Sequence, residues 1–220
     1  QNYPLNPLAA FSSINSSAIA MSPLYLVKLA EVNFLRAEGA LRGWNMGGTA
    51  EHFYNEGIKY AFLDEPMQVS DGMGGFYGQY HDALADYMAL EQAVPYTQVE
   101  VSGDGEDWES VTKIGVKWND GDDQETKLEK IITQKYIALF PLSTEAWTEM
   151  RRTGYPKVFP VLNTDDGDGS IEQGEMIRRF PWNASDPIVQ QLIEASGLAT
   201  LGGPDLQATR LWWDVDAPNF

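Results

Sequence analysis

The stretch IITQKYIALFPLSTEAWTEMRRTGYP, residues 131–156, decides the fold of this chain. Apolar side chains recur at helical spacing from just before this stretch to its middle, and one lysine contributes its aliphatic stem. These residues are Leu128, Ile131, Ile132, Lys135, Tyr136 and Leu139. Pro141 interrupts this run, and Ser143 or Thr144 can cap a second helical run that ends at two arginines before Gly154. The stretch therefore predicts a helix that bends at Pro141 and stops at Gly154.

Two further helices are predicted upstream, and they form an antiparallel hairpin. Ser22 and Pro23 start the first helix and Gly43 ends it, and its apolar stripe consists of Val27, Ala30, Phe34, Ala37 and Leu41. Thr49 caps the second helix, whose inner face consists of Ala50, Phe53, Tyr54, Gly57 and Ala61. The spacing on that face is similar to the second helix of a tetratricopeptide repeat, in which alanine is commoner than glycine at the position of Gly57.

The remaining chain adds one helix on either side of the central stretch and two excursions. A third helix is expected over about residues 80–93, after a glycine-rich loop. Residues 95–123 change to a period of two, which is typical of a β-hairpin, and residues 157–181 form a second hairpin or loop excursion. A last helix starts at Pro187 and ends at Gly197, with its apolar residues inward. The fold class is therefore mainly α, with tetratricopeptide-like helix hairpins and small β-hairpin insertions, in a single domain over residues 1–220.

The composition excludes several classes of protein. The 220 residues are 43% hydrophobic and carry a formal net charge of -17, with a pI of about 4.3. Such acidity disfavours binding to nucleic acid or to anionic lipid, because both depend on basic patches. The absence of cysteine excludes disulfides and thiolate chemistry. No stretch is apolar over enough residues to span a bilayer and no signal peptide opens the chain, so we expect any membrane anchor in sequence outside these residues.

An acidic loop in the second excursion is the candidate metal site. With Gly169 at the sixth position of a calcium loop, carboxylates fall at the third, fifth, ninth and twelfth positions, at Asp166, Asp168, Glu172 and Glu175. The first position is Thr164, which is a poor ligand, and the flanking segments are not the helices of an EF-hand. A solvated Asp/Gly turn is therefore favoured over a calcium site, and both interpretations stay open.

Aromatic residues in loops and hairpins are the candidate ligand-binding residues. Sugars present apolar C–H faces, so their sites combine an exposed ring with polar side chains that bond the hydroxyl groups. Two groups have this composition, namely Phe76 and Tyr77 with Gln79, and Trp108 and Trp118 with Asn119. For any single ring, packing in the core is the alternative. We expect four other tryptophans to pack: Trp44, Trp147, Trp212 and Trp213.

Signals for catalysis are poor. His52 and His81 stand alone, without metalloprotease spacing or a candidate triad, and no nucleophile elbow, phosphate loop or dinucleotide fingerprint occurs. The acidic residues do not single out a glycosidase carboxylate pair. Two arginine doublets, Arg151–Arg152 and Arg178–Arg179, are interpreted as structural clamps between the central helix and the second excursion, because their planar forks suit fixed bonds to carboxylates and carbonyls. The sequence thus predicts no catalytic residue.

Three short motifs, QKYIALF, EAWTEMRRTGYP and IRRFPW, occur in this order. Their wording and order resemble the SusD/RagB-like outer-membrane lipoproteins of the Bacteroidetes, over residues 22–183. The resemblance implies a helical scaffold with tetratricopeptide-like hairpins, and this chain corresponds to the C-terminal portion of such a protein. The chain departs from the family in lacking the lipid-bearing cysteine, the signal peptide and the first part of the fold.

The resemblance also implies a function. SusD-like proteins are surface-exposed, non-enzymatic members of starch utilization and related systems, which capture nutrients, most often glycans. They deliver the nutrient to a SusC-like TonB-dependent transporter, so we expect a glycan ligand and that transporter as partners. We expect the outer membrane as the location, through an N-terminal lipid anchor absent from this chain. The resemblance assigns no role to the acidic loop or to the hairpin with Trp108 and Trp118.

Two alternatives to a nutrient-binding protein stay open. The first is a helical-repeat module for protein–protein interaction, dependent on calcium through the acidic loop or independent of it, without a small ligand. The second, less favoured, is a hydrolase, which release of glycan products would establish. The sequence does not identify the ligand, so starch-like, mucin-derived and other glycans, and also peptides, remain candidates.

Overall fold

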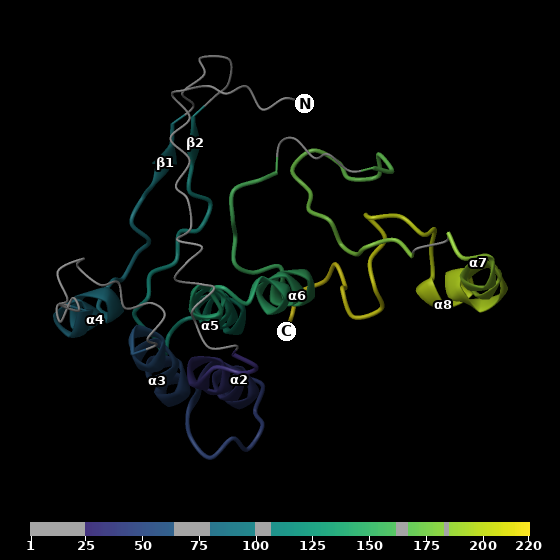
Figure 1. Cartoon of the computed structure of the whole chain (residues 1–220). Helices are drawn as coiled ribbons and strands as arrows, with labels where there is room; N and C mark the ends of the chain where they lie inside the picture. The colour runs from purple at the N-terminus through teal and green to yellow at the C-terminus, as the bar shows by residue number, and fades with distance from the viewer. Residues whose placement is uncertain (1–24, 64–79, 100–106, 162–166, 183–184) are drawn as a thin grey trace, which may run out of the picture. The chain divides into compact units, whose positions relative to one another are not determined.

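The computed structural model describes residues 25–63, 80–99, 107–161, 167–182 and 185–220 (Figure 1). The chain divides into two compact units: residues 1–149, 155–158 and 220 form unit 1, and residues 150–154 and 159–219 form unit 2. Helices dominate the described residues, and a two-stranded antiparallel sheet belongs to unit 1. The prediction of a mainly helical fold with a small β-hairpin is confirmed, and the expectation of a single domain stays a prediction.

Helices α2 (Leu29–Leu41) and α3 (Ala50–Phe62) form the predicted hairpin in unit 1. Gly43 follows the end of α2 with a φ of +80°, a conformation that glycine adopts without strain. At the start of α3, Thr49 Oγ1 accepts a hydrogen bond of 3.1 Å from the backbone N–H of His52. Both boundaries agree with the prediction.

The predicted starting residues, Ser22 and Pro23, lie outside the described residues, and α2 begins at Leu29, later than predicted. The residue before it, Lys28, has an extended backbone with φ of -94° and ψ of 145°. Its side chain is buried, and Nζ donates hydrogen bonds to the carbonyls of Ala138 at 3.1 Å and Phe140 at 2.6 Å. These contacts, about a hundred residues away along the chain, satisfy carbonyls that the end of a helix leaves without partners.

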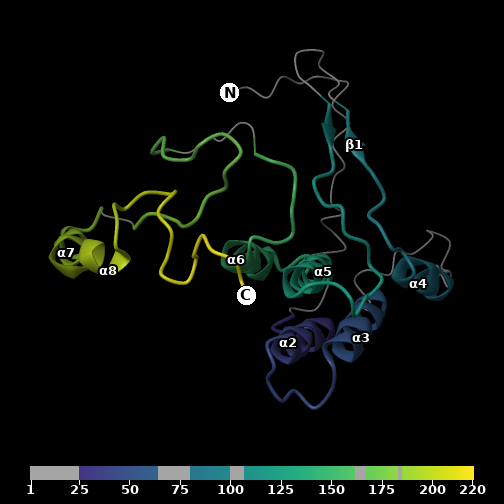
Figure 2. The same ribbon diagram turned by 180° about the vertical axis from the view of Figure 1, so that it is seen from behind.

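The core of unit 1 lies where α2 and α3 pack against helix α5 (Gln124–Ala138), as Figures 1 and 2 show from opposite sides. The helices contribute these buried apolar side chains: Ala30, Phe34 and Ala37 from α2, Phe53, Tyr54 and Ile58 from α3, and Leu128, Ile131, Ile132 and Ala138 from α5. Burial of one large apolar side chain contributes about 1.5–3 kcal/mol. This three-helix contact is therefore the main stabilising feature of unit 1.

Pro141 separates α5 from helix α6 (Ser143–Thr153), and Gly154, with a φ of +75°, follows the end of α6 as predicted. Ser143 is the first residue of α6, and its backbone N–H donates a hydrogen bond of 2.9 Å to Pro141 O in the turn before the helix. Within the described residues, none of the helices combines the length and the apolar character needed to cross a membrane.

Helix α4 (Tyr80–Met88) is shorter than the expected range of 80–93. The carbonyl of Leu90 accepts the backbone N–H of Val116 at 2.8 Å, and Gln92 forms an antiparallel bridge with Ile114. Strand pairing thus takes over the backbone groups that a longer helix would use.

Helix α7 (Pro187–Leu192) begins as predicted in unit 2, where Asp186 Oδ1 accepts the N–H of Ile188 at 2.7 Å. The predicted end at Gly197 is wrong: a π-helical turn, η2 (Ile193–Gly197), leads into α8 (Leu198–Leu201). Gly197 keeps a helical φ of -61°, and a Cβ there would lie 3.2 Å from the Trp182 ring. No residue of these helices is buried, so the expected inward apolar face is also wrong in the part that the structure describes.

Two tryptophans that were expected to pack are exposed. Trp44 is 65% exposed in unit 1, where its backbone N–H bonds Gly39 O to finish α2 and its ring faces solvent. Trp212 is 88% exposed in unit 2. Asp214, which bonds Leu211 O through its backbone N–H, is the residue of this turn that points inward.

Candidate functional site

A β-hairpin carries the predicted ligand residue Trp108. Strand β1 (Thr97–Gln98) pairs antiparallel with strand β2 (Trp108–Glu109), so that Gln98 lies opposite Trp108. Figures 1 and 2 show the paired strands extending away from the helices of unit 1. The Trp108 side chain is 37% exposed, and a ligand can reach it there.

The base of this hairpin is fixed to the core of unit 1. The hydroxyl of Tyr54, a fully buried residue of α3, donates a hydrogen bond of 2.6 Å to Val116 O. Burial raises the pKa of the Tyr54 hydroxyl, which therefore stays a donor. Gly115 passes so close to the other strand that a Cβ would lie 2.2 Å from the carbonyl carbon of Glu91. The strands therefore leave the core from a defined position.

Trp118 and Asn119 lie near this base and serve the local structure. The half-buried Trp118 ring lies 5.2 Å from the Tyr54 ring, and its Nε1 donates to Asp120 Oδ1 at 3.0 Å. Asn119 Oδ1 accepts the N–H of Gly121 at 2.9 Å, which forms a local turn. Their role in ligand binding stays a prediction. Four other predicted site residues lie outside the described residues: Phe76, Tyr77, Gln79 and Asp166.

Two described carboxylates of the acidic loop, Asp168 and Glu175, have protein partners. Asp168 Oδ1 accepts the N–H of Ser170 at 3.0 Å, and Oδ2 accepts the N–H of Gln207 at 2.8 Å. The Ser170 side chain and these two amides lower the pKa of the Asp168 carboxyl by hydrogen bonding. Glu175 pairs with Arg178 at 3.1 Å, whereas Glu172 is exposed. In the part of the chain that the structure describes, no three His, Asp or Glu side chains gather as a metal site, and calcium binding stays a prediction.

Within unit 2, Arg151 joins α6 to the second excursion as the sequence predicts, whereas Arg178 and Arg179 bind carboxylates of the C-terminal segment instead. Arg151 Nη1 donates to Arg178 O at 2.6 Å, and its guanidinium lies 4.8 Å from the centroid of the Trp213 ring. Arg178 lies 3.5 Å from the fully buried Asp214 carboxylate. Arg179 pairs with Asp205 and lies 4.8 Å from the centroid of the Trp182 ring. These charges hold unit 2 together.

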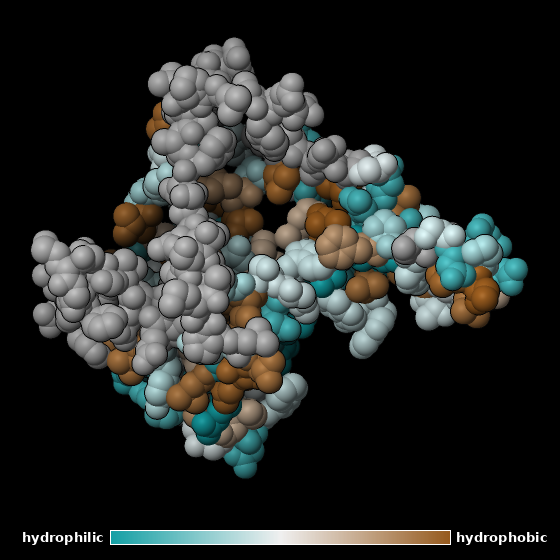
Figure 3. Space-filling model, in the orientation of Figure 1, coloured by the Kyte–Doolittle hydropathy of each residue, from teal (hydrophilic) through white to brown (hydrophobic). Residues whose placement is uncertain are grey.

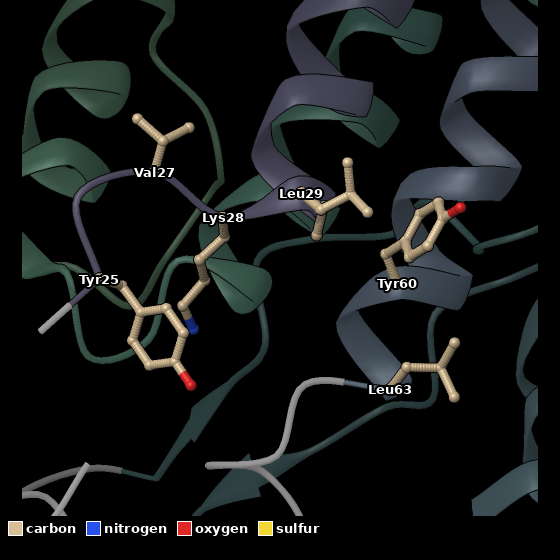
Figure 4. Close-up of a pocket in the computed structure, with 7 residues that line it drawn as sticks. Tyr25, Val27, Lys28, Leu29, Tyr60 and Leu63 are labelled. Atoms are coloured by element: carbon tan, nitrogen blue, oxygen red, sulfur yellow. The ribbon is translucent and has the colours of Figure 1, made fainter. Parts of the chain in front are cut away.

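A pocket of about 310 Å³ opens in unit 1 where the segment before α2 passes the end of α3 (Figure 4). Its lining is largely apolar: Tyr25, Val27, Lys28, Leu29, Ala30, Tyr60 and Leu63. Figure 4 shows the Lys28 side chain beside the Tyr25 ring, with Nζ 5.2 Å from the ring centroid. Because Nζ also donates to two carbonyls at the C-terminal end of α5, its charge serves the fold, and we assign no ligand to this pocket.

The family to which the chain belongs follows from comparison with known proteins. The family model for SusD-like proteins, described as SusD and RagB outer membrane lipoproteins, matches residues 6–214. The chain is therefore a member of the SusD-like family, as its three motifs predict. No match was found among curated proteins.

Solved structures agree with this membership. The chain is 43% identical to a chitin-binding SusD homologue from Flavobacterium johnsoniae, with a TM-score of 0.74, over 90% of this chain and 38% of that one. It is 36% identical to a SusD homologue from Bacteroides uniformis, with a TM-score of 0.71, over 89% of this chain and 38% of that one. The SusD-like fold is thereby confirmed, and the chain spans 38% of the length of these relatives.

Proposed function

We propose that the complete protein binds oligosaccharides at the cell surface and delivers them to a SusC-like TonB-dependent transporter. Membership of a family of outer-membrane lipoproteins supports the location. The observation that carries the ligand class is the 43% identity, over 90% of this chain, to a chitin-binding homologue. The exposed Trp108 on a fixed hairpin supports the same ligand class, because a ring can stack on the apolar face of a sugar.

Neutral oligosaccharides are the ligands that we propose, with chitin-derived chains first among them. A net charge of -17 over 220 residues repels uronates and sulfated sugars. N-acetylated sugars carry no charge, and their amide groups can exchange hydrogen bonds with polar side chains. The protein binds these chains without cleaving them, which is the role that membership of the family implies.

Calorimetric titration of the complete protein with chitin, cellulose and starch oligosaccharides of equal length tests this function. We expect saturable binding that is tightest for the chitin oligosaccharides, and chromatography after incubation should recover ligands of unchanged length. Failure to bind any of the oligosaccharides would refute the glycan-binding function. Shortened products would show instead that the protein is a hydrolase. Isolation of the protein from native membranes without a TonB-dependent transporter would contradict the proposed delivery of the ligand to that transporter.

A further inference from the structure

One face of the β-hairpin gathers two aromatic side chains around an amide. Residues two apart on a strand share a face, and directly paired residues share it across the strands. Because Gln98 pairs with Trp108, Tyr96 lies on the same face as both. The bond from Ser110 N to Tyr96 O, of 2.7 Å, shows that this register continues to Tyr96.

The three side chains are open to solvent. Tyr96 is 57% exposed and Trp108 is 37% exposed, and Gln98 between them is also exposed. The Tyr96 hydroxyl donates a hydrogen bond of 3.4 Å to Gln98 Oε1. This contact orients the amide of Gln98, whose nitrogen carries two N–H donors. Two apolar surfaces and a pair of donors therefore face the same side of the hairpin.

This combination fits a sugar chain better than a protein or lipid surface. Each sugar ring offers a C–H face to an aromatic ring and hydroxyl groups at its edge to an amide. Diagonal neighbours in an antiparallel pair lie about 7–8 Å apart, so Tyr96 and Trp108 can each contact a different ring. The hairpin also carries acidic residues, Asp107 and Glu109, which favour a neutral ligand over an anionic one.

The hairpin is suited to hold these groups before a ligand arrives. Its strands start from backbone bonds to Leu90 and from the hydroxyl of the buried Tyr54. Binding to a site with fixed side chains loses less conformational entropy than binding to mobile ones. A pair of strands anchored in the core is therefore a better platform for stacking than a loop of the same composition.

We propose that Tyr96, Gln98 and Trp108 form a subsite for two consecutive sugar rings of a neutral oligosaccharide. The two aromatic rings stack on the sugars, and Gln98 donates hydrogen bonds to hydroxyl or N-acetyl oxygens between them. This assignment rests on the proposed function, and it adds Tyr96 and Gln98 to the predicted Trp108.

Titration of the complete protein and its variants with chitin oligosaccharides tests the subsite. We expect Tyr96→Ala and Trp108→Ala each to weaken binding by about tenfold, as for central residues of an interface. Trp108→Phe, which keeps a ring, should recover most of the affinity. Gln98→Glu keeps the size of the side chain but removes both amide donors, and should weaken binding without a change in melting temperature.

Two matched variants control for loss of a ring and for damage to the hairpin. Trp44→Ala removes an exposed tryptophan of unit 1 outside the hairpin, and Val111→Ala shortens an exposed side chain that follows β2. Both should bind as the wild type does. If the wild type binds and the Tyr96, Gln98 and Trp108 variants stay within twofold of it, the subsite is refuted while the proposed function stands. If the wild type binds none of the oligosaccharides, the subsite and the proposed function are both refuted.

Discussion

A methyl group at Gly57 would collide with the core. A Cβ at this position of α3 would lie 2.7 Å from Cε1 of Phe34, an aromatic ring with no exposed surface. Alanine is better than glycine in a helix by about 1 kcal/mol, but overpacking a core costs about 1–3 kcal/mol. We expect Gly57→Ala to lower the stability of the protein, as measured by the midpoint of urea unfolding followed by circular dichroism.

Gly167→Ala is the matched control for this substitution, because nothing lies within 4 Å of a Cβ there. Replacing Phe34 by leucine in the Gly57→Ala background should restore part of the lost stability, since the ring atoms in the way are removed. A Gly57→Ala midpoint at or above that of the wild type would mean that the ring moves aside without cost. The spacing on α3 indicates a tetratricopeptide-like helix, and the contact with Phe34 explains why glycine occurs here.

Lys135 shows what the spacing of residues can predict about a side chain and what it cannot. Its helical spacing predicts that the stem lies inward, and only 2% of the residue is exposed. The pattern does not show where the charge goes. Nζ lies 2.9 Å from Glu149 Oε1 in α6 and 4.0 Å from Glu31 in α2. Partners this distant in sequence depend on the packing of the helices, so periodicity alone cannot identify them.

At the scale of elements, the sequence predicts a boundary correctly where its cause is local. Thr49 bonds an amide three residues away, and Gly43 and Gly154 adopt their own positive φ. The prediction is wrong where a contact with residues distant in the sequence determines the helix boundary. The start of α2 follows from Lys28, whose side chain bonds carbonyls at the C-terminal end of α5, and Gly197 stays helical beside the Trp182 ring.

For the β-hairpin too, the sequence predicts some features and not others. Alternation and a Gly/Asp turn predict its existence, and the hairpin context makes Trp108 a candidate for an exposed ring. The sequence does not identify Tyr96 as a site residue, because only the pairing of Gln98 with Trp108 shows that Tyr96 shares a face with Trp108. A shift of one residue in that pairing would place Tyr96 and Trp108 on opposite faces. The register is known only from the structure.

The acidic loop gives a prediction for an element of unit 2. Both oxygens of Asp168 accept backbone amides, and Glu175 faces Arg178. No cluster of three carboxylate or imidazole ligands gathers there in the part of the chain that the structure describes, and Glu175 is already paired, so we expect calcium to leave the melting temperature of the complete protein unchanged relative to magnesium. Asp168→Ala should lower the melting temperature equally with either ion, because the bond to Gln207 is lost. A melting temperature that rises with calcium in the wild type, but not in the Asp168→Ala and Glu175→Ala variants, would instead establish a calcium site.

At the scale of the molecule, helix α2 is apolar on two sides. Its inner stripe lies in the core, while its outer residues Leu29, Val32 and Leu35 are between 38% and 55% exposed. Figure 3 shows hydrophobic residues gathered where α2 lies. Exposed apolar residues gathered on the outer side of a helix are typical of a surface that another part of a larger structure covers. This composition is consistent with a chain that matches 38% of the length of its solved relatives.

The net charge of -17 predicts how salt separates two classes of ligand. The Debye length is about 30 Å at 0.01 M salt and about 3 Å at 1 M, so the field of the whole chain reaches a ligand at low salt only. We expect the affinity for a neutral chitin oligosaccharide to change little between these conditions. A uronate oligosaccharide of equal length should bind more weakly at low salt and gain affinity as salt rises. Titrations of both ligands across this range measure the effect, with the neutral ligand as the control for any influence of salt on the fold. Tighter binding of the uronate at low salt would mean that cationic side chains near the site outweigh the acidic surface, and would overturn the preference for neutral sugars.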